Sequence, residues 1–254
     1  MGSADDPTAR FAELASLPAD VLPLDEAILL VAAHHHALDL QAQLARLDAL
    51  AVRCRAGSVE SVIEVLFADE AFSGDSREYH HPDNSFLDRV LDRRRGLPIL
   101  LSIVTAEVAA RAGVCLAYVA LPGHVVLRDC EDSDRFIDPF NGGRILTGAE
   151  CLALSPGCDV RHLEPVESRA ILLRVVTNLV HSFAGRGEVH GLAWALHLRA
   201  IVAGDAEQPW TDVARIRERL GDWTGAADVY DRLARQSSDD DLRQRARAVR
   251  ARTN

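Results

Sequence analysis

The sequence contains no lysine, so all 28 of its basic side chains are arginines. A lysine that forms a Schiff base with a carbonyl substrate is therefore excluded. A phosphate loop of the Gly-Lys-Ser/Thr kind is excluded for the same reason. The remaining basic groups are guanidinium groups, which hold carboxylates and phosphates in planar, two-pronged contacts.

Long apolar runs and paired cysteine motifs are also missing. The most apolar stretch, residues 97–104, is far too short to cross a bilayer. The first ten residues are polar and lack the apolar region of a signal peptide, so none is expected. The five cysteines are odd in number and include no Cys-x-x-Cys spacing, which argues against a disulfide framework or a zinc knuckle. We therefore expect a cytoplasmic protein without a membrane partner.

The charge balance and the histidine pattern exclude two further classes. The net charge of −10 repels phosphate backbones, so no nucleic-acid partner is expected. His34, His35 and His36 are consecutive, and a helix would direct them away from one another. His80 and His81, with Asp83, lie in a predicted loop and lack a second pair of ligands. Neither a metal site nor a cofactor is predicted.

The first part of the chain is predicted to be mainly helical. Residues 1–22 read as a loose lead-in, and Ser85 with Asp88 is interpreted as a capping box. Apolar spacing and helix end signals predict helices over residues 24–31, 38–55, 59–67, 86–94 and 98–112. The segment 98–112 is apolar nearly all round, which is typical of a helix at the centre of a domain.

Short β-branched segments follow this helix. Strands are predicted over residues 114–120, 125–128 and 135–137. A six-residue hairpin loop would place Arg128 opposite Arg135 and His124 opposite Pro139, and a slip of one residue would place His124 opposite Asp138. Either pairing brings an imidazole close to a carboxylate. The sequence thus predicts an α+β domain with a central buried helix on an antiparallel sheet.

From about Ser168 the chain is predicted to be helical to its end. Gly187 and Gly221 each follow a helical stretch and lie 34 residues apart. This helix-turn-helix period is the signature of tetratricopeptide repeats. We expect three parts: a lead-in over residues 1–22, the α+β domain over 23–166, and a tetratricopeptide-type helical segment over 168–254.

The order of motifs resembles that of the transglutaminase-like superfamily, and its fuller pattern looks like the bacterial SirB-type branch with C-terminal tetratricopeptide repeats. The resemblance runs from about Leu24 to Arg235. It rests on the strings Asn84-Ser85-Phe86-Leu87, Arg93-Arg94-Arg95-Gly96-Leu97-Pro98-Ile99, Pro122-Gly123-His124 and Ile137-Asp138-Pro139-Phe140-Asn141-Gly142-Gly143.

The resemblance implies a catalytic triad from which the nucleophile is missing. In active members a Gly-x-Cys string begins the central helix, where the helix dipole favours the thiolate. Here the string is Gly96-Leu97-Pro98, while the His and Asp of the family match His124 and Asp138. Ser102, one turn further along the same helix, is a candidate substitute, although a hydroxyl there often bonds back to a helix carbonyl. Cys115 is a weaker candidate, because a buried cysteine behaves as a small hydrophobe.

Two functional hypotheses follow. In the first, the domain is a non-catalytic (pseudoenzyme) binding or regulatory protein that recognises a peptide or protein partner. In the second, it hydrolyses or transfers amide bonds with His124 as base, Asp138 as its orienting group, and Ser102 or water as nucleophile. The candidate binding residues are Arg94, Arg95, Gly96, Pro98, Asn141 and Arg144. Arg94, Arg95 and Arg144 would hold a carboxylate if they lined a cleft, but they are equally compatible with solvated surface charges.

Overall fold

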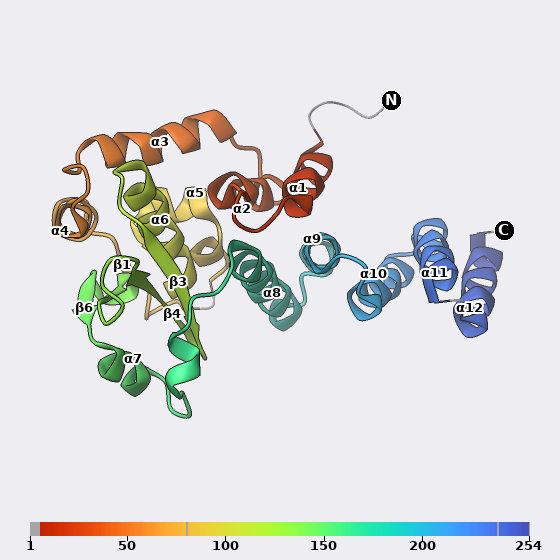
Figure 1. Ribbon diagram of the computed structural model, residues 1–254. Coiled ribbons are helices and arrows are strands. Elements are labelled where there is room, and N and C mark those ends of the chain that lie inside the picture. The colour runs from red at the N-terminus through yellow and green to blue at the C-terminus, as the bar shows by residue number, and fades with distance from the viewer. Residues whose placement is uncertain (1–5, 80, 238, 254) are drawn as a thin grey trace. The chain divides into compact units, whose positions relative to one another are not determined.

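A computed structural model of the protein describes residues 6–79, 81–237 and 239–253. The chain divides into two compact units, one up to Val175 and one from Val176 onwards (Figure 1). The first unit contains helices and a sheet, whereas the second contains helices alone. His80, one of the two neighbouring histidines considered above as metal ligands, lies outside the described residues.

The first unit begins with helices that have clear start signals. The expectation of a loose lead-in is wrong, because residues 7–16 form a helix with Phe11 and Leu14 buried. Asp6 caps this helix by accepting a hydrogen bond from the Thr8 amide, and Pro7 fills its first turn. The helices of this unit are α1 (Pro7–Ser16), α2 (Leu24–Ala33), α3 (Leu40–Val52), α4 (Val59–Ile63), α5 (Leu87–Arg93), α6 (Pro98–Arg111) and α7 (Gly148–Leu154), and α8 (Ser168–Arg186) leads into the second unit.

Two helix ends differ from the prediction. Helix α4 continues into a π-helical turn, η1 (Glu64–Asp69), rather than running on as regular α-helix. Helix α5 starts at Leu87 with Phe86 as its N-cap and no side-chain cap. The proposed capping box is therefore wrong. The carboxylate of Asp88 bonds His36 of the loop after α2, with 2.6 Å between Nε2 and Oδ2.

The main sheet has four antiparallel strands in the order β3-β4-β5-β6. Their bounds are Leu116–Leu121, His124–Asp129, Phe136–Asp138 and Arg144–Leu146. Arg128 pairs with Phe136, and the Asp129 amide donates to the Arg135 carbonyl oxygen. The loop is one residue shorter than predicted, so neither predicted register is correct. A short parallel bridge joins β1 (Ser73–Gly74) to β2 (Arg95–Gly96).

Helix α6 is the centre of the first unit. It packs against β3 and β4 on one side, and against α2, α3, α4 and α5 elsewhere on its surface (Figure 1). Eleven of its fourteen residues are buried, among them Ser102 and Thr105. Since almost no face of this helix meets water, its apolar sequence is accounted for. The prediction of a buried central helix on an antiparallel sheet is confirmed.

A disulfide joins Cys115, just before β3, to Cys130, just after β4. The interpretation of Cys115 as a buried free cysteine is therefore wrong, and the argument against disulfides fails for this pair. Strands β3 and β4 pair from Leu116 with Asp129 onwards, which brings the residues just outside the ladder within bonding reach. The Cα atoms are 5.5 Å apart, as is usual for a disulfide. Cys54, Cys151 and Cys158 are free thiols.

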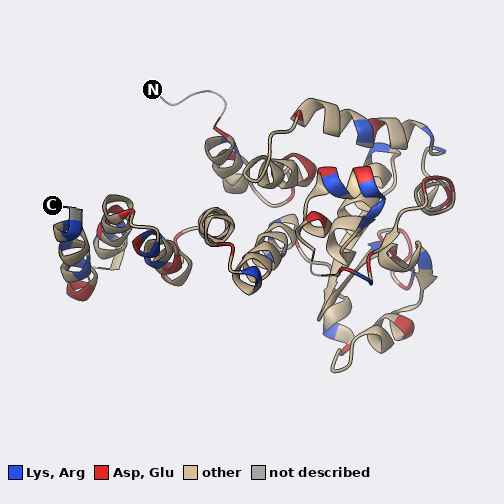
Figure 2. Cartoon of the chain, turned by 180° about the vertical axis from the view of Figure 1, so that it is seen from behind, with Lys and Arg blue, Asp and Glu red and all other residues tan. Residues whose placement is uncertain are grey.

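The second unit holds the rest of α8, followed by α9 (Val189–Ala203), α10 (Glu207–Arg219), α11 (Trp223–Ser237) and α12 (Asp240–Arg250). From α9 on, each helix packs on the next one along the chain. Gly187 and Gly221 have positive φ angles of 70° and 77°, which fit the left-handed turns that end helices. Acidic and basic residues are interspersed along the helices of both units (Figure 2). Among the described residues, no helix is both long and apolar enough to cross a membrane.

Candidate functional site

His124 and Asp138 form a hydrogen-bonded pair at one end of the sheet. His124 is the first residue of β4, and Asp138 is the last residue of β5. The ring nitrogen Nε2 lies 2.9 Å from Oδ1 of Asp138. The Asp138 side chain is 1% exposed, whereas that of His124 is 15% exposed. The imidazole therefore reaches solvent while its carboxylate partner is enclosed.

Asp138 is held by more than the histidine. Its carboxylate accepts hydrogen bonds from the Asn141 side chain, at 2.6 Å, and from the backbone amides of Phe140 and Asn141, at 3.2 and 3.4 Å. Burial alone raises the pKa of Asp138, but the bonds from His124 and Asn141 outweigh it, so this pKa lies below its ordinary value. The carboxylate is thus ionised and fixed, which orients the imidazole. Nδ1 of His124 has no hydrogen-bond partner among the described residues, and this nitrogen is the one left to meet a ligand.

Phe140 forms a wall beside the pair. Its ring lies edge-on to the His124 ring, with 5.8 Å between the centroids. Gly74 packs on the face of Phe140 so closely that a Cβ there would lie 2.5 Å from the ring. Gly74 belongs to the bridge with Gly96, the residue that precedes α6 by two positions. Glycine at position 74 is therefore required by this approach.

The start of α6 carries Pro98 as its first helical residue. Pro98 and Ile99 are buried, and Leu97 is the N-cap without a side-chain hydrogen bond. Proline suits this position, because its missing amide hydrogen would have no partner within the helix. Proline has no side-chain group that can act as a nucleophile. The first position of α6, where the helix dipole would stabilise a thiolate, therefore carries no thiol.

The other nucleophile candidates are engaged elsewhere. The hydroxyl of Ser102 is fully buried and donates to the carbonyl oxygen of Val125, at 3.2 Å, rather than to His124. Cys115 is consumed in the disulfide. Burial, with added repulsion from Asp138, raises the pKa of Cys151 to about 12, and this thiol packs in the apolar cluster of the sheet. A thiol with that pKa is inert at neutral pH.

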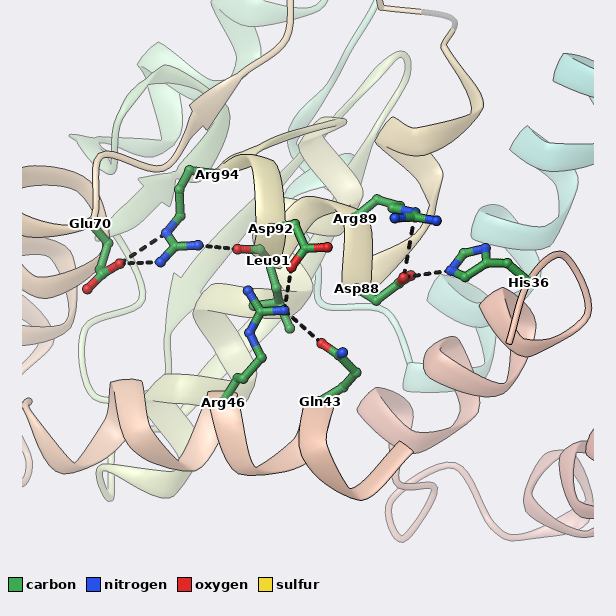
Figure 3. A network of polar contacts seen from close by, with 9 residues as sticks. All are labelled: His36, Gln43, Arg46, Glu70, Asp88, Arg89, Leu91, Asp92 and Arg94. Atoms are coloured by element: carbon green, nitrogen blue, oxygen red, sulfur yellow. Dashed lines mark hydrogen bonds and ion pairs between the residues drawn. The ribbon is translucent and has the colours of Figure 1, made fainter. Parts of the chain in front are cut away.

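The three candidate binding arginines are dispersed. Arg94 bonds Glu70 (Figure 3). It also lines a cavity beside α3. Arg144 forms an ion pair with Glu150 at 3.0 Å, and Arg95 lies exposed in β2. Of the predicted binding residues, Asn141 is the one whose side chain hydrogen-bonds the His124–Asp138 pair, while Arg144 is the cross-strand partner of Asp138 between β5 and β6.

One polar network near this site was missed by sequence reasoning. Arg93 donates to the side chains of Asn84, at 2.9 Å, and Asp75, at 3.0 Å. Asp75 in turn accepts from the amides of Arg77 and Glu78. The network ties the loop after β1 to α5, and thus fixes the segment that carries Gly74. The sequence signal that could have indicated this network is Asn84, nine residues before the arginine-rich string that starts at Arg93.

Comparison of the sequence with known proteins identifies a family and several relatives. Residues 32–177 match the family described as the transglutaminase-like superfamily. A UPF0162 protein of Xylella fastidiosa is 38% identical over 135 residues, which cover 49% of this chain and 48% of that protein. A UPF0162 protein of Pseudomonas aeruginosa is 31% identical over 180 residues, covering 64% and 66%.

A eukaryotic protein shares the same region. F-box only protein 21 of Homo sapiens is 30% identical over 126 residues, which cover 46% of this chain and 20% of that protein. The chain spans about half the length of the first curated relatives that it matches. No solved structure matches it. More than half of the chain lies within the family match, and the chain therefore belongs to the transglutaminase-like superfamily.

Proposed function

We propose that this protein is a non-catalytic member of its superfamily, which binds a peptide or protein segment at the His124–Asp138 pair. The observation that carries the proposal is Pro98 at the first position of α6, where active members have their cysteine. An acyl-transfer mechanism needs a group that attacks the carbonyl carbon, and proline supplies none.

The preserved pair supports a binding role. Asp138 keeps its carboxylate fixed through Asn141, and His124 directs Nδ1 away from it. The imidazole in this position offers one further ring nitrogen for a hydrogen bond with a peptide amide or carbonyl group. The ring of Phe140 lies alongside and offers an apolar contact. This arrangement has the mixed polar and apolar character of a peptide contact site.

The helical unit supports the same role. We assign it to the tetratricopeptide type on the 34-residue spacing of Gly187 and Gly221, and the whole chain to the SirB-type branch on the motif strings between Asn84 and Gly143. Ala226, Tyr230 and Leu233 of α11 are buried, as the repeat pattern requires. Repeats of this type present surfaces suited to extended peptides.

Amide hydrolysis by an activated water is the second candidate, and the intact hydrogen bond between His124 and Asp138 favours it. A histidine held by a carboxylate can take a proton from water without a protein nucleophile. The version with Ser102 as nucleophile is weaker, because its hydroxyl faces the Val125 backbone.

A peptide library separates the two. The parent protein, His124→Ala and His162→Ala would each be incubated with a mixed peptide library, and retained peptides and new products followed by mass spectrometry. His162 is the matched control, since it also bonds an aspartate but lies outside the site. We expect retention of a peptide subset by the parent and by His162→Ala, reduced in His124→Ala, and no product. Cleaved or transferred amides that vanish only in His124→Ala would replace the binding proposal with the hydrolase.

A further inference from the structure

A cavity of about 220 Å³ lies in the first unit, away from the histidine pair. It is bounded by α3, by α5 and by the segment that follows η1. Three arginines and one glutamate reach it, and its apolar wall includes Leu50 and Phe72, which are 8% and 2% exposed. His124, Asp138 and Asn141 are not part of its lining.

Glu70 holds two of the arginines in place. Its Oε2 accepts hydrogen bonds from Nε and Nη2 of Arg94, at 3.0 and 2.7 Å, and its Oε1 accepts one from Arg53. The Arg94 guanidinium also donates to the Leu91 carbonyl oxygen (Figure 3). It lies over the ring of Phe72, 5.4 Å from its centroid. These contacts fix the cations before any ligand arrives, which lowers the entropic cost of binding.

Unused donors remain at the cavity. Nη1 of Arg46 donates hydrogen bonds to the side chains of Asp92, at 2.7 Å, and Gln43, at 2.9 Å (Figure 3). Its Nε and Nη2 have no hydrogen-bond partner among the described residues, and neither does Nε of Arg53. A guanidinium group with two adjacent free donors matches the two oxygens of a carboxylate.

The charge balance disfavours a ligand with more than one negative charge, and a singly charged ligand would be held by the free donors rather than by a net positive charge. The three arginines are already offset by Glu70, by Asp69 at 3.1 Å from Arg53, and by Asp92. A doubly charged phosphate would gain little net attraction and would approach three carboxylates. The volume is below the range usual for drug-sized ligands, so the apolar part must be compact.

From these observations we propose a binding site for a carboxylate carried on a small apolar body, with the carboxylate on Arg46 and Arg53 and the apolar body against Leu50 and Phe72. Two sources have this chemistry: a free short-chain organic acid, and the carboxyl terminus of a peptide that ends in an apolar residue. The site is separate from the peptide contact proposed at His124, and neither proposal depends on the other.

Calorimetric titration of the full chain tests the site. The probes are 4-methylpentanoate, its uncharged analogue 4-methylpentanamide, inorganic phosphate, and N-acetyl-alanyl-leucine as a chain terminus. Arg46→Gln removes the free guanidinium donors, and Ala49→Leu fills the cavity from an exposed helical position with little loss of helix propensity. Arg89→Gln is the matched control, since this arginine lies on α5 but does not line the cavity.

We expect the carboxylate to bind at least tenfold more tightly than the amide. Arg46→Gln should weaken binding about tenfold, Ala49→Leu should abolish it, and Arg89→Gln should leave it unchanged. Binding of the acetylated dipeptide as well would identify a chain terminus as the source, and binding of the free acid alone would identify a small organic acid. No binding by either acid, equal binding of acid and amide, phosphate binding as tight as that of the carboxylate, or no effect of Arg46→Gln would overturn the proposal.

Discussion

The carboxylate of Glu107, on α6, should give the free energy of unfolding an unusual dependence on pH. Its carboxylate shares Arg111 with Asp25, and its side chain is only 21% exposed. Burial first, and repulsion from Asp25 second, raise the pKa of Glu107 from 4.5 to about 7, although Arg111 opposes both. The folded protein therefore binds a proton here more tightly than the unfolded chain does.

The sign of the effect follows from that difference. Between pH 4.5 and pH 7 the folded state holds a proton that the unfolded state has released, so stability falls as the pH rises through this window. The shift of about 2.5 units between the two pKa values, at 1.36 kcal/mol per unit, corresponds to a loss of about 3 kcal/mol.

Glu107→Gln mimics the protonated acid and removes the effect. Arg111 keeps Asp25 and Asp48 as partners, so no cation is left unpaired. We expect the variant and the parent to have similar unfolding free energies at pH 4.5, and the variant to be more stable by about 3 kcal/mol at pH 8. Urea unfolding at both pH values measures this, with Glu64→Gln as an exposed control on η1. A difference between variant and parent that stays constant from pH 4.5 to pH 8 would refute the reasoning.

Three other perturbations test the site and its frame. Pro98→Cys should create a thiol that iodoacetamide alkylates at pH 6.5 at least tenfold faster than the same thiol in the double variant Pro98→Cys with His124→Ala. Equal rates in the two variants would show that a side chain at position 98 does not interact with the His124–Asp138 pair. Gly74→Ala should lower stability by about 1–3 kcal/mol, because its Cβ would meet Phe140 at 2.5 Å, whereas Gly185→Ala, in open helical space, should not, as chemical unfolding can determine. Thiol titration of the denatured, unreduced protein should count three free thiols, and a count of five would show that Cys115 and Cys130 are not joined.

The centre of the fold is readable from the sequence because its signals are local. An apolar helix between Gly96 and Gly113, followed by β-branched runs separated by Pro122-Gly123, leaves few alternatives for residues 98–129. Helix α1 was missed although Asp6 and Pro7 are ordinary start signals, since its apolar residues are few. The pattern there was too weak to outweigh a polar beginning.

What the sequence could not predict depends on contacts between distant segments. The pairing of Cys115 with Cys130 follows from the register of β3 and β4, which no spacing rule supplies. The bond between Glu70 and Arg94 joins η1's end to α5 across 24 residues. Arg94 also adopts a left-handed backbone, with φ of 57°, at the end of α5, where glycine is the usual choice. The proximity of His124 and Asp138 was predictable because both lie on one hairpin, yet their register was not, since it depends on a loop one residue shorter than expected.

The order of the four strands has a consequence for how the protein folds. Each strand pairs with the next one along the chain, so every pairing closes a short loop and costs little chain entropy. His124 and Asp138 are only 14 residues apart, and the bond between them can form as soon as this hairpin does. The start of α6 must then dock from outside the hairpin. We expect amide hydrogens of β4 to gain protection in refolding before those of α6, and the reverse order in pulsed exchange would contradict this. With this order of assembly, a substitution at position 98 would not disturb the pairing of β4 with β5, because that pairing forms first.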